Sequence, residues 1–166
     1  MKLKLKPKYL LEALVLVVAL LAAEAFLTRD AVRGPAPPFQ ALTLDGNSFD
    51  LADLKGRPAV IHFWATWCPV CDLEQGMVER LARSHPLISV AMQSGTEEEV
   101  AEWMAGRGVA YPVVNDPTGE LAERYGVTAV PASFVLDRQG RVRFVTRGYT
   151  SGLGMRARLW LAGWHR

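Results

Sequence analysis

The strongest constraint on this chain is a strand-like run followed by two cysteines and a helical pattern. The apolar run from Ala59 to Ala65 is typical of a buried strand, and Cys68-Pro69-Val70-Cys71 opens the helical pattern after it. Unpaired backbone N–H groups and the helix dipole at a helix start favour a thiolate on Cys68. Because the second thiol lies one turn further on, the pair predicts reversible dithiol–disulfide exchange.

Other uses of this cysteine pair need residues that the chain does not have. A structural zinc site takes about four Cys or His ligands, but Cys68 and Cys71 are the only cysteines and the three histidines are scattered. A c-type haem site requires a histidine directly after the second cysteine, where this chain has Asp72. A purely structural disulfide across so short a loop constrains little of the unfolded chain.

Length and charge narrow the class of protein. A chain of 166 residues, half of them hydrophobic, predicts one domain plus an extension. The net charge of +2 arises in the first 30 residues, where five basic residues face three acidic ones. Beyond them fourteen basic residues balance fourteen acidic ones, so nothing indicates nucleic-acid binding.

One local imbalance of charge remains at the C-terminal end. From Arg138 onward the chain has seven arginines and no acidic residue. A solvated strand edge and helix face account for this pattern, and contact with anionic lipid headgroups is the alternative.

The N-terminal 27 residues are typical of an export segment. A basic stretch at 1–8 with four lysines precedes an apolar stretch at 9–27, which Glu12 and Glu24 interrupt near its ends. We expect residues 9–27 to be an uncleaved membrane anchor; the alternatives are a signal peptide cleaved after Ala25 and, least favoured, a buried soluble helix. The lysines should stay in the cytoplasm, which places the rest of the chain in an oxidising compartment.

The remaining residues predict a linker at 28–38, rich in Pro and Gly, and a folded domain at 39–166. Strands and helices alternate in the domain, and the expected fold class is α/β. The expected strands are Phe39–Leu44 and Ser48–Leu51 around an Asp45-Gly46 turn, then Ala59–Ala65, Leu87–Met92, Tyr111–Val114, Ser133–Leu136 and Arg141–Val145. The expected helical segments are Asp50–Leu54, Cys68–Arg83, a helix from Thr96 to Gly106 or Gly108, Thr118–Tyr125 and Gly154–Trp164.

From about Pro35 to its end, the chain resembles the thioredoxin superfamily, and within it the membrane-tethered TlpA/ResA/DsbE group of bacterial exported proteins. The resemblance rests on Pro35-Ala-Pro-Pro-Phe39, Phe63-Trp-Ala-Thr-Trp-Cys-Pro-Val-Cys71, Tyr125-Gly-Val127, Val130-Pro131 and Phe134-Val-Leu-Asp137. It implies a thioredoxin-like fold, with a central mixed β-sheet flanked by helices and an N-terminal β-hairpin extension. Four further runs resemble the protein disulfide oxidoreductase branch, which includes suppressor-of-copper-sensitivity D proteins: Cys68-Pro-Val-Cys71, Gln93-Ser-Gly95, Val113-Val-Asn-Asp116 and Arg147-Gly-Tyr149.

The resemblance assigns roles to single residues. Cys68 matches the attacking thiol and Cys71 the resolving thiol, which together form the redox disulfide. Pro131 matches a cis-proline that faces the cysteines, although an ordinary turn proline would read the same. Val130 would offer backbone groups to an extended substrate, and Trp67 would form a platform beside the cysteines.

The resemblance leaves the roles of three further residues open, one on the expected strand Ala59–Ala65 and two on the expected helix Cys68–Arg83. Glu74 matches an acidic residue near the active site that could move protons to or from Cys71; a solvated helix glutamate is the alternative. His62 stands where thioredoxin has a buried acid, and it is either a proton acceptor or a satisfied core histidine. Gly76 stands where relatives often have a helix-kinking proline.

The function that the resemblance implies is protein disulfide oxidoreductase activity on protein thiols and disulfides, with no cofactor and no metal. It also implies a single-pass protein of the bacterial inner (cytoplasmic) membrane, with its domain facing the periplasm and an upstream membrane redox partner. Two alternatives stay open. A thiol peroxidase would need a Thr-x-x-Cys context, whereas Thr66 is two residues before Cys68. A copper-binding or copper-delivery module is the other.

Overall fold

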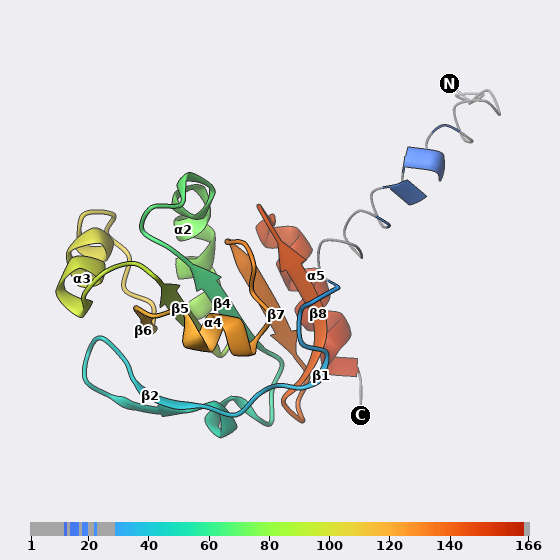
Figure 1. The fold of residues 1–166 in the computed structure, drawn as a ribbon. Coiled ribbons are helices and arrows are strands. Elements are labelled where there is room, and N and C mark those ends of the chain that lie inside the picture. The colour runs from blue at the N-terminus through green and yellow to red at the C-terminus, as the bar shows by residue number, and fades with distance from the viewer. Residues whose placement is uncertain (1–11, 13, 17, 20–21, 23–28, 165–166) are drawn as a thin grey trace.

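A computed structural model describes residues 29–164, and residues 12, 14–16, 18–19 and 22 before them. Its main sheet has six strands in the order β1-β8-β7-β4-β5-β6, and a separate two-stranded hairpin has the order β2-β3 (Figure 1). The strands are β1 Gly34–Pro35, β2 Gln40–Leu42, β3 Ser48–Asp50, β4 Ala59–Trp64, β5 Leu87–Met92, β6 Val113–Asp116, β7 Ala132–Leu136 and β8 Arg141–Arg147. The helices are the short 3₁₀ helix η1 Leu51–Leu54, then α2 Pro69–Ala82, α3 Glu97–Ala105, α4 Glu120–Arg124 and α5 Gly152–Trp164.

The sheet is mixed, as expected. Strand β4 lies in its middle, parallel to β5 and antiparallel to β7, and all six of its residues are buried. Such a continuous apolar run is typical of a strand covered on both faces. The β7–β8 hairpin and β1 complete the antiparallel half of the sheet.

Two hydrophobic clusters cover the two faces of this sheet. Helices α2, α3 and α5 share one cluster, which contains the cysteine pair together with Trp64 of β4. Helix α4, η1 and the β2–β3 hairpin share the other cluster, which contains Phe63 and Tyr125. Since neighbouring side chains of β4 point to opposite faces, Phe63 and Trp64 belong to different clusters. These layers confirm the thioredoxin-like fold and the N-terminal hairpin.

Several element boundaries differ from the expected ones by one or two residues, and two of the differences have a clear cause. Strand β6 begins at Val113 rather than Tyr111, because the Tyr111 side chain is buried against α2 before the chain joins the sheet edge. Helix α4 begins at Glu120 rather than Thr118. A turn at Asp116–Gly119 comes first, and the Asp116 carboxylate then accepts hydrogen bonds from backbone N–H groups at the start of α4.

The described part of the expected linker, residues 29–38, lies against the domain. Ala31 is buried, and the Val32 N–H donates to the Tyr125 carbonyl at 3.2 Å. Strand β1 then pairs with the outer edge of β8. Covering an edge strand in this way protects its backbone groups from pairing with other chains.

The expected basic stretch at 1–8 and most of the expected anchor at 9–27 lie outside the described residues. Among the residues that are described, no helix is both long enough and apolar enough to cross a bilayer.

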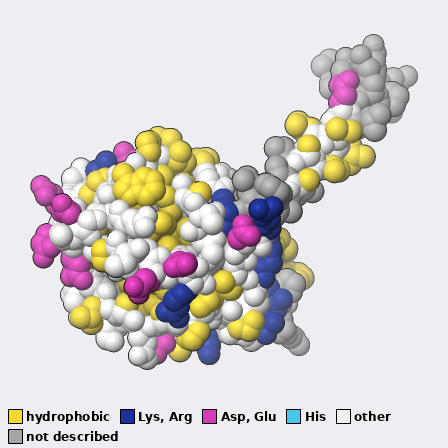
Figure 2. Space-filling view, viewed as in Figure 1, with side chains coloured by type: hydrophobic (Ala, Val, Ile, Leu, Met, Phe, Trp, Pro, Cys, Tyr) yellow, Lys and Arg dark blue, Asp and Glu magenta, His cyan; other side chains and the backbone are white. Residues whose placement is uncertain are grey.

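Charged side chains are unevenly distributed over the visible face of the domain. Figure 2 shows Lys and Arg side chains gathered along the side where β1, β8 and α5 lie, and Asp and Glu side chains gathered on the opposite side, at α3. Three glutamates fill the first turn of α3, where the helix dipole stabilises negative charge.

Candidate active site

The two cysteines form a disulfide at the first turn of α2. Cys68 is the N-cap residue, with extended backbone, and Pro69 takes the first helical position, which proline favours. The Cys68 sulfur accepts a hydrogen bond from the Cys71 N–H at 3.1 Å. Cys68 is 5% exposed and Cys71 is fully buried, so Cys68 is the outer sulfur of the pair.

The Val130–Pro131 peptide bond faces the disulfide, and it is cis, as predicted. The carbonyl oxygen of Val130 lies 3.6 Å from the Cys68 sulfur. The Pro131 carbonyl accepts a hydrogen bond from the Gly148 N–H at 2.8 Å, which fixes this loop against the end of β8. Residues 62 positions apart in the sequence therefore meet at the reactive sulfur.

Trp67 lies beside the cysteines with 59% of its surface exposed. Its indole N–H donates to the Gln93 carbonyl at 2.9 Å, and the neighbouring Thr66 N–H donates to the Ser94 hydroxyl at 3.0 Å. The loop before Cys68 is therefore held by the residues that follow β5. Gln93 and Ser94, which the sequence marked only by resemblance, therefore hold the loop before the reactive cysteine in place.

Glu74 is buried in α2, three residues after Cys71 and on the same side of the helix. Its carboxylate accepts a hydrogen bond from the Thr150 N–H. Burial raises the pKa of Glu74 to about 7, although the hydrogen bond from Thr150 acts in the opposite direction. The alternative of a solvated helix glutamate is thus wrong, since only 1% of Glu74 is exposed.

His62 is also buried, on the face of β4 that carries Trp64 and that α2 covers. Its Nδ1 lies 2.9 Å from the Ser133 hydroxyl on the neighbouring strand, and its Nε2 has no protein hydrogen-bond partner. Burial lowers the pKa of His62 to about 4, so the imidazole is neutral at physiological pH.

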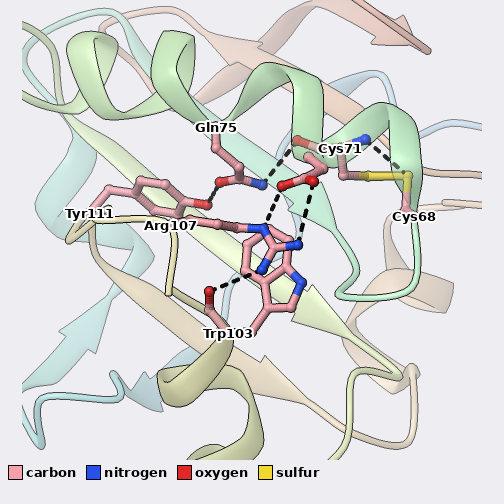
Figure 3. Close-up of polar contacts among 7 residues, drawn as sticks. Cys68, Cys71, Gln75, Trp103, Arg107 and Tyr111 are labelled. Atoms are coloured by element: carbon pink, nitrogen blue, oxygen red, sulfur yellow. Dashed lines mark hydrogen bonds and ion pairs between the residues drawn. A yellow bond between two sulfur atoms is a disulfide. The ribbon is translucent and has the colours of Figure 1, made fainter. Parts of the chain in front are cut away.

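A second group of contacts joins the first turns of α2 to the segment after α3 (Figure 3). The guanidinium of Arg107 pairs with the carboxylate of Asp72 and lies over the Trp103 ring, 3.7 Å from its centroid. The Gln75 amide donates to the Cys71 carbonyl at 3.0 Å and accepts from the Tyr111 hydroxyl. Nothing in the sequence pattern pointed to these contacts, because Arg107 is 35 positions from Asp72 and Tyr111 is 36 positions from Gln75.

Helix α2 is continuous from Pro69 to Ala82, through the exposed Gly76. Among the described residues, no group of three or more His, Cys, Asp or Glu side chains lies close enough to hold a metal ion.

A redox-active cysteine pair at the start of a helix, opposite a cis-proline on a mixed sheet, defines a thiol–disulfide oxidoreductase of thioredoxin-like fold. Residues 32–145 match the AhpC/TSA family, and the chain belongs to it. Relatives that are named DsbE and ResA place it with the ResA- and DsbE-like members. The narrower branch of suppressor-of-copper-sensitivity D proteins stays a prediction.

Relatives of known sequence agree with this class. The chain is 36% identical over 140 residues to a thioredoxin-like protein of Haemophilus influenzae, covering 80% of this chain and 83% of that protein. It is 34% identical over 118 residues to the thiol:disulfide interchange protein DsbE of Xylella fastidiosa, covering 69% of this chain. In that comparison the matched region spans 60% of the DsbE protein.

Solved structures show the same fold. The structure of MTB DsbF has a TM-score of 0.67 at 34% identity, covering 75% of this chain and 94% of DsbF. A DsbE-like protein of Chlorobium tepidum has a TM-score of 0.71, covering 80% of this chain and 98% of the other. At 24% identity, the second comparison bears on the fold alone.

Proposed function

We propose that this protein is exported, held at the bacterial inner membrane by its N-terminal segment, and exchanges its cysteine pair with thiols and disulfides of other proteins. The observation that carries the proposal is the position of Cys68. It is the outer sulfur of the pair, at a helix N-terminus, beside the carbonyl of Val130. An extended substrate segment can bond to the Val130 backbone while its own sulfur meets Cys68.

In the reducing direction, the Cys68 thiolate attacks one sulfur of a substrate disulfide, and the other substrate sulfur leaves as a thiolate. Cys71 then loses its proton and attacks the Cys68 sulfur. This step forms the Cys68–Cys71 disulfide and releases the second substrate thiolate. Two electrons pass to the substrate, whose thiolates take protons from solvent, and the reverse sequence oxidises a substrate dithiol.

We assign the proton of Cys71 to Glu74 rather than to His62. A general base works best when its pKa lies near the ambient pH. Glu74, with a pKa of about 7, meets this condition, whereas His62, with a pKa of about 4, is a weak base that stays neutral. His62 then acts as a core side chain bonded to Ser133.

The surface around Cys68 fits protein substrates. Trp67, Val70 and Leu73 follow one another at three-residue spacing on the loop and first turns of α2, and all three side chains are exposed. Apolar side chains around a reactive sulfur favour unfolded or loosely folded segments, which expose apolar residues of their own.

The location rests on the first 27 residues. Four lysines followed by an apolar stretch of near-membrane length support an anchor with the domain on the far side of the membrane. The cysteine pair gives up or receives two electrons with each turnover and must be regenerated, so we propose an upstream redox partner in the same membrane.

Trapping of mixed disulfides tests the exchange function. Cys71→Ser removes the thiol that resolves the intermediate, so substrates should remain bound to Cys68. Non-reducing gels of cells that carry this variant should show added high-mass bands that vanish with reductant. Cys68→Ser is the matched control, and equal trapping by that variant would contradict the assigned roles.

Fractionation tests the location independently. The native protein should stay with membranes in alkaline carbonate and should have the intact mass of the full chain. A soluble product that begins at Phe26 would show that the segment is a cleaved signal peptide and not an anchor. A membrane-impermeant thiol reagent should label reduced Cys68 in intact spheroplasts if the domain faces outward.

The direction of electron flow is decided by the reduction potential. Equilibration of the cysteine pair in glutathione buffers measures it directly. A potential near the about −270 mV of thioredoxin would make the protein a reductase, and one near the about −120 mV of DsbA would make it an oxidase.

A further inference from the structure

The outer face of α5 is apolar where a surface helix would ordinarily be polar. Four large apolar residues of α5 point outward, and each is between 43% and 81% exposed. They are Leu153, Trp160, Leu161 and Trp164. We call these four residues and Ala157 the α5 face. The opposite side of α5 already packs into the core through Met155, Leu159 and Ala162. The α5 face is therefore surplus to what the fold needs.

Helix α5 is almost entirely apolar, although only one of its sides packs into the core. Its sequence, GLGMRARLWLAGW, contains only two polar side chains, Arg156 and Arg158. The Trp160 and Trp164 rings lie together on the exposed surface, with centroids 4.8 Å apart. Trp is the residue that prefers the boundary between water and lipid, because its ring is largely apolar and its N–H is polar.

Charge along the C-terminal part of the chain, which contains α5, has one sign. From Arg138 to the C-terminus there are seven arginines and no acidic residue, and Arg138, Arg141 and Arg156 are exposed. The glutamates of α3 lie at the other side of the molecule (Figure 2). The domain therefore has a basic, aromatic side and an acidic side.

We propose that the α5 face rests on the surface of an anionic phospholipid membrane, with Trp160 and Trp164 at headgroup depth and Arg156 among lipid phosphates. Arginine beside an anionic membrane gains electrostatic attraction, and apolar side chains gain by leaving water. A second copy of the chain fits this face less well, since a two-fold contact would bring its own arginines together.

The entry of the chain into the domain agrees with this placement. Ala31 and β1 lie along β8, and α5 packs against β7 and β8. Strand β1 and α5 therefore lie on the same side of the domain (Figure 1). Contact through α5 would orient the domain on its tether and leave the start of α2, which carries Cys68, outside the contact.

This inference rests on the proposed membrane location, and the test separates the two. The full chain is incorporated into vesicles of phosphatidylcholine, alone or mixed with phosphatidylglycerol, with or without brominated acyl chains, which quench nearby tryptophans. We expect brominated, phosphatidylglycerol-containing vesicles to quench the emission, and Trp160→Phe/Trp164→Phe to lower that quenching about twofold or more. Trp67→Phe, in the exposed tryptophan beside Cys68, is the matched control and should leave the quenching in place.

Charge variants test the choice of lipid. Arg156→Gln/Arg158→Gln should reduce the quenching in vesicles with phosphatidylglycerol and leave it unchanged in phosphatidylcholine alone. None of these α5 variants should change the rate of insulin disulfide reduction, which shows that the domain is folded.

Four results would overturn the inference. If the protein floats with the vesicles and Trp160 and Trp164 are not quenched, the anchor holds but the α5 face does not touch lipid. If the full chain does not float with anionic vesicles, the membrane location fails as well. Equal quenching in the two lipid compositions, or loss of a crosslinked protein partner from native membranes in the tryptophan variant without any change in quenching, would assign the face to something other than anionic lipid.

Discussion

The carboxylate of Glu74 in α2 accepts a hydrogen bond from the backbone N–H of Thr150, which lies two residues before α5 begins. The two residues are 76 positions apart, and their hydrogen bond joins α2, which carries the resolving cysteine, to the segment that leads into α5. Because the carboxyl group is buried, its protonated form is favoured in the folded protein.

Glu74 should make the protein less stable as the pH rises. Its pKa is about 7 when folded against 4.5 in the unfolded chain, so the folded state binds more protons between these values. The free energy of unfolding should fall by about 3 kcal/mol as the pH rises through this window. Glu74→Gln keeps a hydrogen-bond acceptor for Thr150 and should remove this slope, as measured by urea unfolding at a series of pH values.

Glu79→Gln is the matched control for Glu74→Gln. Hydrogen bonds, chiefly from the Ala110 N–H, lower the pKa of Glu79, so its contribution to stability is present above pH 4.5 and is lost on acidification. The two variants should therefore change the slope in opposite directions. A slope that Glu74→Gln leaves unchanged would show that Glu74 titrates normally.

His62 should oppose Glu74 over much of the same range. Its pKa is about 4 when folded against 6.5 when unfolded, so the unfolded chain binds more protons between these values. Stability contributed by His62 should be present above pH 6.5 and fall by about 3 kcal/mol towards pH 4. In the native protein the two slopes should largely cancel between pH 4.5 and 6.5. His62→Gln should expose the Glu74 slope, and a variant whose stability stays level across this range would contradict the prediction.

Arg107 should support the thiolate of Cys68 by neutralising Asp72, which lies in the first turn of α2 next to Cys71. Arg107→Gln leaves the Asp72 charge unpaired and should raise the pKa of the Cys68 thiol by on the order of half a unit. Thiolate absorbance at about 240 nm against pH measures this pKa in the reduced protein. Adding Asp72→Asn should restore it.

Arg83→Gln is the control for this pair. Arg83 forms an ion pair with Glu79 near the other end of α2, away from the cysteines. Arg83→Gln should leave the pKa of the Cys68 thiol unchanged and should lower the free energy of unfolding by at most about 1 kcal/mol. An equal shift in both variants would mean that overall charge, rather than the contact with Asp72, sets the thiol pKa.

Gly126 should be essential for fixing the entry segment to the domain. Its φ is +67°, and a Cβ atom there would lie 2.0 Å from the carbonyl oxygen of Asp30. Gly126→Ala should therefore destabilise the protein by about 2–4 kcal/mol. It should also increase hydrogen exchange at Val32, whose N–H bonds to the Tyr125 carbonyl.

Gly46→Ala is the matched substitution. Gly46 has a similar φ of +79°, but a Cβ atom there would meet nothing within 4 Å. It should cost only about 1–2 kcal/mol of backbone strain. If the two variants lose the same stability, the close approach of Asp30 contributes nothing.

The sequence alone determined the local units of this protein. The apolar run of β4, the cysteine that begins α2 and the start of α3 at Thr96 depend on interactions over a few residues, so patterns and propensities were enough to predict them. The cysteine pair could be assigned to redox chemistry because strand, turn and helix start are contiguous.

Tertiary structure decided how these units become a site. The burial of Glu74, the bond from Trp67 to Gln93, and the ion pair of Arg107 with Asp72 all join segments from different elements. The pairing of β1 with β8 is equally distant in sequence. No local pattern encodes such contacts, because they follow from the packing of two layers on one sheet. That packing sets the solvation of each charged group, and solvation decides which carboxyl group can take a proton near neutral pH.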